Sequence, residues 1–331
     1  MIRKVRIEEA VGMALGHDVA RVVPGETGVL PFRRGYVVRE EDIPQFLDIG
    51  KEHIYVVESE ESEAHEKEAA GRIALATVGE GLEFDSPAGG AARIKAKHTG
   101  VLKINVPLLD EVNTMGSFAI GTRHNWTVCT EGQAVAVAKT MPLYIAEEKL
   151  ARLEEMCGSR GKILSLLPFR LKKAGAVITG NEVYKGRIKD RFAEVIARKV
   201  EPFGASLVNT KVVPDDIAAI GSAVREMHGA GCEVIFACSG MSIDPDDVTM
   251  DGIRESGAEV IMEGVPMMPG AILGLAMLRD VPVIGTPAGA LRGGLTALDG
   301  VLPMIFAGVR PDARDIAKMG HGGFCLEKYT F

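Results

Sequence analysis

The sequence lacks an excess of basic residues: its 38 Lys and Arg are outnumbered by 45 Asp and Glu, and the formal net charge is −7. A chain with this balance has no global positive field to attract nucleic acid or anionic lipid. It also lacks the run of about 20 apolar residues that a membrane span needs. Charges at positions 3, 4, 6, 8 and 9 interrupt the amino terminus too often for a signal peptide. We therefore expect a cytoplasmic protein that binds a small molecule, with no nucleic acid or membrane as partner.

Cysteines and aromatic residues are also few. The five cysteines form no C-x-x-C pair, and the seven histidines show no ligand spacing, so free thiols are expected and a zinc site is not. The chain contains only 11 Phe, five Tyr and one Trp but 39 Gly. This glycine-rich, aromatic-poor composition favours an α/β fold over an all-β sandwich. A length of 331 residues predicts two or three domains.

Residues 1–57 are predicted to form a small α+β region. Apolar residues at helical spacing indicate a helix over 40–49, followed by Gly50 as a stop signal, and short apolar runs indicate strands at 36–38 and 53–57.

Residues 58–165 are predicted to form a β-rich accessory region. Period-two patterns at 93–97 and 101–106, with many glycines between them, are typical of short strands. A charged helix over 146–157 and a linker at 158–161 follow.

Residues 166–331 change character, because short apolar runs alternate with segments of helical periodicity. The alternation predicts a doubly wound, mostly parallel α/β sheet, in which ligands bind at the carboxyl ends of the strands. The expected strands are 174–179, 207–213, 232–238 and 281–285, and a final helix carries Leu295 to Phe306.

Two of the loops that follow these strands carry polar residues. The first, Thr179 to Glu182 with Asp190 after it, could bring backbone amides to an anion, or could be a turn with a helix cap. In the second, Asp215 is placed to cap the next helix and Asp216 to meet its dipole, although the pair could equally hold Mg²⁺.

A third loop, Cys238 to Thr249, is the most acidic. Ser239, Gly240 and Ser242 offer hydroxyls and amides to a phosphate, and Asp244, Asp246 and Asp247 crowd three carboxylates into four residues. Such crowding costs stability through repulsion unless a cation or amides compensate it, so we favour a functional role. Cys238 itself is expected to be a buried strand end. Two Pro-Gly-type loops, at 268–271 and 285–289, could be plain turns.

Together the five loops resemble the molybdopterin-binding domain shared by molybdopterin adenylyltransferases and molybdopterin molybdotransferases. The matching segments span about residues 172–310, and the Asp-Pro-Asp-Asp-Val-Thr sequence resembles a stand-alone molybdopterin-binding subgroup. They are Thr179 to Glu182, Pro214 to Asp216, Cys238 to Asp247, Pro269-Gly270 and Pro287 to Gly289.

The resemblance implies a role in molybdenum cofactor biosynthesis, as a homo-oligomer. It implies either Mg²⁺-dependent adenylyl transfer from ATP to molybdopterin, or molybdate insertion into the adenylylated pterin; both would make the chain a transferase. Asp215, Asp216 and Asp247 would then be catalytic, with Asp215 or Asp216 holding Mg²⁺ together with Asp247. The cofactor-binding residues implied are Thr179, Gly180, Glu182, Asp190, Ser239, Gly240, Ser242, Pro269, Gly270, Pro287 and Gly289.

The sequence departs from the family pattern at several of these loops. Ser239 and Ala288 replace glycines, Ala271 replaces a lysine, and Arg191-Phe192 replaces Ser-Asn. These changes motivate a second hypothesis, a non-catalytic carrier or sensor of the cofactor. A third is a nucleotide pyrophosphatase acting on ADP-ribose-type substrates, since the resemblance extends to such proteins.

Overall fold

The computed structural model describes residues 2–21, 29–57, 63–238, 241, 247–292 and 295–323. The chain divides into two compact units. Unit 1 comprises residues 1–97, 104–123 and 132–165, and unit 2 comprises residues 98–103, 124–131 and 166–331. Within the described ranges, no helix has the length and apolar character needed to cross a membrane.

The amino-terminal part of unit 1 folds around Phe46, which is fully buried and stacks on Phe32 with 4.1 Å between ring centroids. The predicted helix is confirmed as a 3₁₀ turn followed by α1, and the strand at 53–57 is confirmed as β4. The predicted strand at 36–38 is wrong, because Val37 makes only an isolated bridge to Ala14. The elements are β1 (Ile2–Arg6), β2 (Val19–Arg21), β3 (Val29–Phe32), α1 (Ile43–Asp48) and β4 (His53–Val57).

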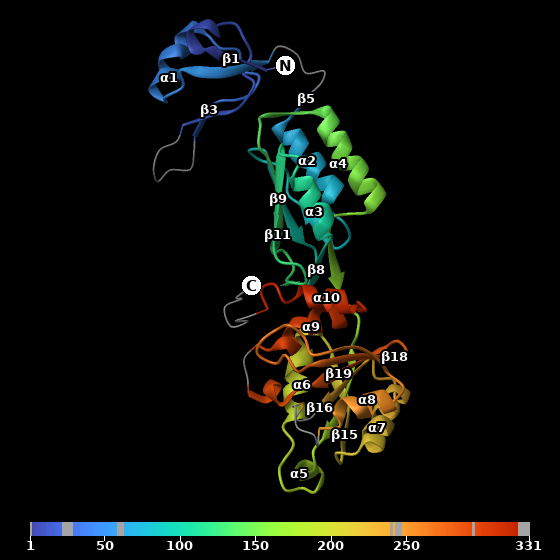
Figure 1. Cartoon of the computed structure of the whole chain (residues 1–331). Coiled ribbons are helices and arrows are strands. Elements are labelled where there is room, and N and C mark those ends of the chain that lie inside the picture. The colour runs from blue at the N-terminus through green and yellow to red at the C-terminus, as the bar shows by residue number, and fades with distance from the viewer. Residues whose placement is uncertain are drawn as a thin grey trace. The chain divides into compact units, whose positions relative to one another are not determined.

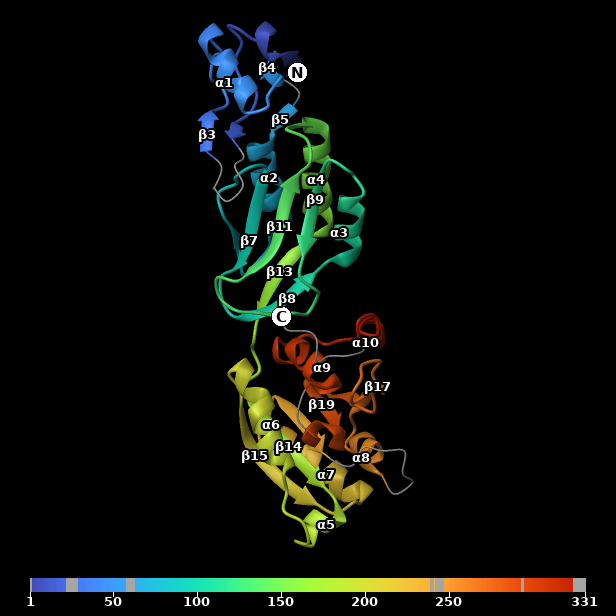
Figure 2. The same cartoon turned by 90° about the vertical axis from the view of Figure 1, so that its left-hand side faces the viewer.

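The rest of unit 1 is built on an antiparallel sheet of order β6-β7-β11-β9, with α2 and α4 on one face (Figures 1 and 2). Ala70 and Ala74 of α2 pack on Ala92 of β7, and these small side chains let the helix lie close to the sheet. The elements are β5 (Glu63–His65), α2 (Glu66–Thr77), β6 (Leu82–Phe84), β7 (Ala91–Ala96), α3 (Val106–Asn113), β9 (Phe118–Thr122), β11 (Ala134–Thr140), β12 (Tyr144–Ala146) and α4 (Glu147–Arg160).

The prediction of a β-rich region is confirmed, and the structure adds detail at two places. The period-two patterns at 93–97 and 101–106 lie largely on strands, at 91–96 (β7) and at 100–104, and two helices, α2 and α3, were not predicted. The predicted linker at 158–161 is wrong, because α4 continues to Arg160 and ends at Gly161, whose φ of +85° suits glycine.

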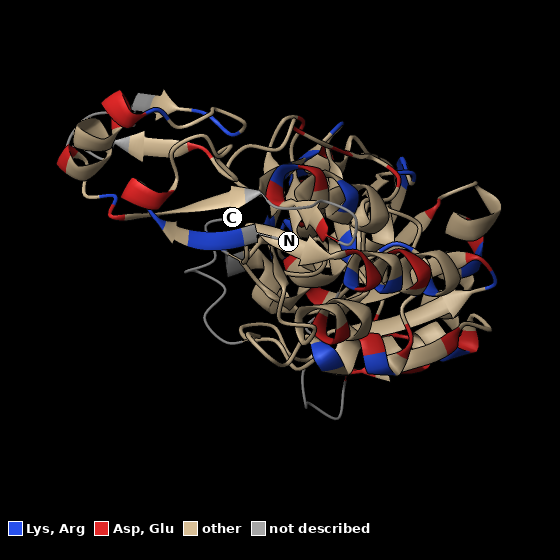
Figure 3. Cartoon of the chain, turned by 90° about the horizontal axis from the view of Figure 1, so that it is seen from above, with Lys and Arg blue, Asp and Glu red and all other residues tan. Residues whose placement is uncertain are grey.

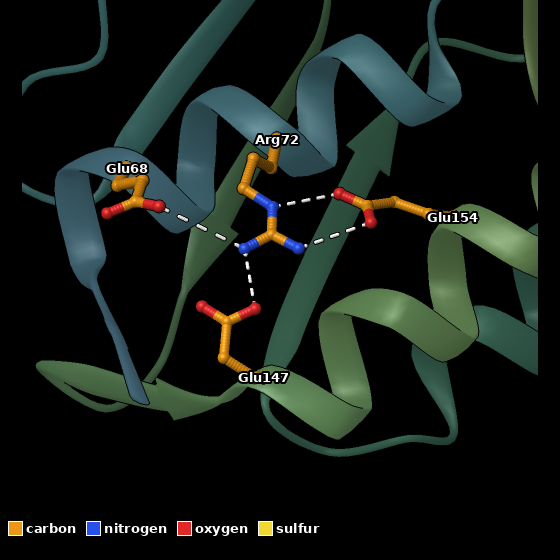
Figure 4. Close-up of polar contacts among 4 residues, drawn as sticks. All are labelled: Glu68, Arg72, Glu147 and Glu154. Atoms are coloured by element: carbon orange, nitrogen blue, oxygen red, sulfur yellow. Dashed lines mark hydrogen bonds and ion pairs between the residues drawn. The ribbon is translucent and has the colours of Figure 1, made fainter. Parts of the chain in front are cut away.

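A cluster of charges joins α2 to α4 (Figure 4). Arg72 of α2 donates from Nε to Glu154 at 2.8 Å and from a terminal nitrogen to Glu147 at 2.7 Å, and Glu68 lies 3.9 Å away. The forked geometry of the guanidinium lets one side chain bind two carboxylates of α4 at once. The cluster therefore fixes the register of the two helices.

Unit 2 contains a six-stranded sheet of order β15-β14-β16-β19-β18-β17. The first four strands in this order are parallel to one another, and β18 runs antiparallel to both of its neighbours, β19 and β17. This arrangement confirms the predicted doubly wound, mostly parallel sheet. Strands β17 and β18 were not predicted. The strands are β14 (Lys173–Thr179), β15 (Ser206–Val213), β16 (Val234–Cys238), β17 (Glu259–Glu263), β18 (Gly274–Leu278) and β19 (Val281–Thr286).

The two faces of this sheet are covered by different helices (Figure 1). One core contains Ile196 of α6 and Leu302 of α9, and the other contains Val224 of α7 and Ile253 of α8. Leu295 lies outside the final helix, which begins later than predicted. The helices are α5 (Asn181–Tyr184), α6 (Phe192–Val200), α7 (Ile217–Gly229), α8 (Thr249–Glu255), α9 (Ala297–Phe306) and α10 (Ala313–Lys318).

Two short segments earlier in the chain also belong to unit 2. They carry β10 (Val128–Cys129) and all but the last residue of β8 (Gly100–Ile104). These two strands form a three-stranded sheet with β13 (Leu164–Pro168). Trp126, in the second segment, packs against the core that contains α6 and α9.

Candidate functional site

The carboxyl ends of the parallel strands bring the predicted loops to one edge of the sheet. Thr179 at the end of β14 pairs with Val213 of β15, and Cys238 at the end of β16 pairs with Thr286 of β19. Strand β14 lies between β15 and β16, so the chain leaves β14 on one side and returns on the other. In an open α/β sheet this reversal leaves a crevice in which ligands bind.

The loop after β14 contains an unsatisfied polar group. Thr179 is only 4% exposed, and its hydroxyl has no hydrogen-bond partner within the described part of the chain. Gly180 follows with φ of +136°, a conformation that L side chains rarely adopt. Glu182, on the short helix α5, is exposed. A buried hydroxyl without a partner costs free energy, and a bound ligand would remove that cost.

The two aspartates after β15 exchange the roles predicted for them. Asp216 caps α7, accepting a hydrogen bond from the Ala219 amide at 2.8 Å. Asp215 instead reaches the neighbouring loop, where its Oδ2 accepts from the Asn181 amide at 2.9 Å. Asp215 therefore ties the loop after β15 to the loop after β14, across the strand pair.

Asp190 caps α6 and lies close to the end of β16. Its two oxygens accept from the amides of Phe192 at 2.7 Å and Ala193 at 3.1 Å. Burial raises the pKa of the Cys238 thiol, a hydrogen bond with Thr286 opposes that shift, and the charge of Asp190 adds to it. A thiol with a raised pKa is a poor nucleophile, in agreement with the expectation for Cys238.

The acidic loop after β16 is described only in part. Ser239, Gly240 and Ser242, with Asp244 and Asp246, lie outside the described residues. Asp247 is described, and its Oδ1 accepts from the Thr249 amide at 3.2 Å at the start of α8. Asp247 therefore takes part in capping α8.

Met241 and Met250 come from either side of this acidic segment and meet over two glycines. Gly274 of β18 and Gly285 of β19 are paired in register. A Cβ at Gly285 would lie 3.1 Å from Met250 Sδ and 3.3 Å from Met241 Sδ, and a Cβ at Gly274 would lie 2.3 Å from Met250 Sδ. The two glycines leave the space that both thioethers fill.

The two Pro-Gly-type loops also lie at this edge, because β18 begins where β19 ends. Gly270 has φ of +98°, and the Pro269 carbonyl accepts from the Ala297 amide at 2.8 Å at the start of α9. Pro287 accepts from the Ala290 amide at 2.9 Å in the 3₁₀ turn that contains Gly289. Each loop has a structural role of its own.

A Mg²⁺ ion at this edge would need ligands beyond the described side chains. Within the described ranges, no three His, Cys, Asp or Glu side chains gather closely enough to hold a metal ion. Mg²⁺ in proteins is commonly held by one or two carboxylates, with water and phosphate oxygens completing its shell. Asp215 suits this role, because its Oδ1 has no partner among the described residues.

Comparison with protein-family models gives two matches. Residues 175–307 match the family described as "Probable molybdopterin binding domain", and every predicted site residue falls within that range. Residues 4–58 match the family described as "Domain of unknown function (DUF8806)".

Curated relatives are similar over a short segment. A CinA-like protein of Mycobacterium tuberculosis is 33% identical over 92 residues, which cover 28% of this chain and 21% of the relative. The CinA-like protein of Mycobacterium leprae is 29% identical over 92 residues, covering 28% of this chain and 22% of the relative. The chain thus spans about a fifth of the length of these relatives.

Solved structures match over about two fifths of the chain. CinA from Thermoplasma acidophilum has 20% identity and a TM-score of 0.35, covering 41% of this chain and 98% of its own. The molybdopterin biosynthesis enzyme MoaB from Thermus thermophilus has 16% identity and a TM-score of 0.32, covering 40% of this chain and 91% of its own.

Proposed function

Since residues 175–307 belong to the molybdopterin-binding domain family, we propose that the chain binds molybdopterin at the carboxyl ends of β14, β15, β16 and β19, in the service of molybdenum cofactor biosynthesis. The observation that carries the proposal is the Thr179 hydroxyl, buried at the switch point without a partner in the described part of the chain. A phosphate oxygen of the ligand would accept its hydrogen bond. The binding loops would be completed by seven described residues: Gly180, Glu182, Asp190, Pro269, Gly270, Pro287 and Gly289. Further phosphate contacts are proposed for Ser239, Gly240 and Ser242, which lie outside the described residues.

A catalytic form of this proposal uses the three aspartates. Mg²⁺ held by Asp215 and Asp247 would neutralise charge on the terminal phosphate of the pterin, in adenylyl transfer from ATP or in molybdate insertion. The protein's own contribution would be positioning: Asp215 already joins two loops, and Asp216 fixes the start of α7. A homo-oligomer is part of the proposal, and analytical ultracentrifugation tests it.

A non-catalytic carrier is the second candidate, and one observation favours it. Asp216 and Asp247 each accept a hydrogen bond from a backbone amide at the start of a helix. One oxygen of each carboxylate therefore stabilises the fold. Ala271 stands where the molybdotransferases have a lysine, which leaves that position without a charge. Both features support binding more directly than turnover.

The experiment combines purification with calorimetry. Mass spectrometry of the small molecules that copurify from a cofactor-producing cell identifies the natural ligand. Titration with molybdopterin, with and without Mg-ATP, then separates the candidates: pyrophosphate release supports adenylyl transfer, and tight binding without release supports a carrier. Hydrolysis of ADP-ribose without pterin binding would replace the proposal with a nucleotide pyrophosphatase.

A further inference from the structure

The segment from Tyr184 to Arg191 presents an alternating run of cations at the edge described above. Lys185, Arg187, Lys189 and Arg191 occupy every second position, and all four are exposed. The two large apolar side chains of the segment are exposed as well, Tyr184 to 55% and Ile188 to 59%. Cations and an open aromatic ring thus share one short stretch of surface.

The four cations are unpaired within the described part of the chain. None of the four forms an ion pair or side-chain hydrogen bond with any described residue. Elsewhere Lys and Arg are interspersed with Asp and Glu along the helices (Figure 3), and Arg72 alone meets three glutamates. Asp190 lies between Lys189 and Arg191, so residues 185–191 carry four cations and one carboxylate, a formal charge of +3. The remaining like charges repel one another, and an anion bound among them would relieve that repulsion.

The backbone that displays these side chains is fixed by hydrogen bonds. The Glu182 carbonyl accepts from the Arg187 amide at 2.8 Å, and the Gly180 carbonyl accepts from the Tyr184 amide at 2.8 Å. Asp190 bonds the first amides of α6, so an anion here would be held by the cationic side chains and not by those amides. A fixed display reduces the entropy lost on binding.

A cation at the start of a helix is otherwise unfavourable. Arg191 occupies the N-cap position of α6, where the helix dipole disfavours positive charge and where Ser, Thr, Asp and Asn are preferred. Lys189 lies two residues earlier. The Asp190 carboxylate between them can offset only one of these two charges, and a bound anion would compensate the other.

We propose that residues 184–191 form a clamp that selects ligands by phosphate charge, binding a pyrophosphate-bearing ligand in preference to its monophosphate. Lys185, Arg187, Lys189 and Arg191 pair with phosphate oxygens, and Tyr184 stacks on the planar ring of the ligand. This clamp deepens the proposed function and rests on it for the location of the ligand, since the segment follows Thr179 and Gly180 directly.

The test compares ADP, AMP and inorganic pyrophosphate by calorimetry on the full chain at low salt. The double variant Arg187→Gln/Lys189→Gln should weaken ADP and pyrophosphate binding by about three- to thirtyfold and AMP binding by less, because two exposed charge pairs are lost. Tyr184→Leu should weaken ADP and AMP but leave pyrophosphate unchanged. Rising salt should erase the preference for ADP over AMP.

A matched double variant, Arg170→Gln/Lys173→Gln, removes the same charge at the opposite end of β14, both side chains being exposed. The seven residues of this strand span roughly 20 Å, beyond the screening length of about 10 Å at 0.1 M salt. This control should bind all three probes as the wild type does. Equal losses in control and test variants would overturn the clamp.

Molybdopterin titrations separate this inference from the proposed function. If the wild type binds molybdopterin, and Arg187→Gln/Lys189→Gln binds ADP and pyrophosphate as the wild type does, the clamp is wrong while the proposed function stands. If the wild type binds ADP through the clamp but not molybdopterin, the proposed function is wrong and the clamp stands. Unchanged melting temperatures in all variants confirm that the comparisons concern binding.

Discussion

Replacing Gly252 with alanine tests how tightly α7 and α8 pack beside the candidate site. A Cβ at Gly252 would lie 2.5 Å from both Cβ and Cγ2 of Ile220, roughly 1–1.5 Å inside the optimal carbon–carbon separation. Ile220 is fully buried, and its Cβ is fixed by the backbone, so no side-chain rotation relieves the overlap. One of the two helices must therefore move.

The magnitude follows from two opposing effects. Overpacking of this kind costs about 1–3 kcal/mol or more, while alanine in a helix interior returns about 1 kcal/mol relative to glycine. We expect Gly252→Ala to lower the free energy of unfolding by up to about 2 kcal/mol. Because α8 begins two residues after Asp247, a displaced α8 should also weaken Mg²⁺-dependent ligand binding.

The matched control is Gly229→Ala at the end of α7, where the new Cβ meets nothing within 4 Å. This variant should be as stable as the wild type or more stable by up to about 1 kcal/mol. Urea denaturation followed by fluorescence suits both variants, since the only tryptophan, Trp126, packs on the core of unit 2. Equal stability of Gly252→Ala and Gly229→Ala would refute the close packing of α7 on α8.

Four further predictions concern single side chains. Asp216→Ala should lower the free energy of unfolding by about 1 kcal/mol, because the α7 cap is lost, and Asp216→Ser should recover most of that free energy. If urea denaturation shows the same loss of stability for both variants, Asp216 does not act as a cap. Cys238, buried with a raised pKa, should react with a thiol reagent at pH 8 only as fast as the protein unfolds, and rapid labelling of its peptide by mass spectrometry would contradict this. Burial lowers the pKa of His17 from its usual 6.5, so the His17 imidazole binds a proton less readily in the folded chain than in the unfolded chain. The contribution of neutral His17 to stability should therefore be complete above pH 6.5 and be lost as the pH falls below it. His17→Gln should reduce the difference in melting temperature between pH 7.5 and pH 5.5. Asp247→Asn should hold or raise the melting temperature while weakening Mg²⁺-dependent molybdopterin binding by roughly ten- to a hundredfold, and unchanged affinity by calorimetry would remove Asp247 from the site.

The parallel part of the sheet could be predicted from sequence because its strands are buried on both faces. Residues 174–179 and 234–238 are almost entirely buried, and such strands appear as short apolar runs bounded by loops. Strand β17 could not be found this way, since Glu259 and Glu263 at its ends are exposed and no residue of the strand is fully buried. Its strand conformation depends on pairing with β18, which is a tertiary contact.

The roles of Asp215 and Asp216 show a similar limit. Local pattern places either residue at the start of α7, and capping preferences do not distinguish two adjacent aspartates. The choice is made by the Asn181 amide, which lies 34 residues away in sequence and binds Asp215. The alternating cations at 185–191, in contrast, are visible in the sequence, and their significance emerges only from the absence of partners among the described residues.

The contribution of residues 98–103 and 124–131 to unit 2 has a consequence for how the chain folds during synthesis. These residues leave the ribosome before any strand of the six-stranded sheet exists. Trp126 therefore cannot pack on its core until α6 and α9 have been synthesised, and α9 ends about 180 residues after Trp126 in the sequence. A fragment that starts at residue 166 would carry the family-matched range complete yet expose the apolar surface that Trp126 covers. The range matched by the family model, 175–307, is therefore smaller than the compact unit that contains it. A protein fragment that preserves unit 2 has to include residues 98–103, 124–131 and 166–331.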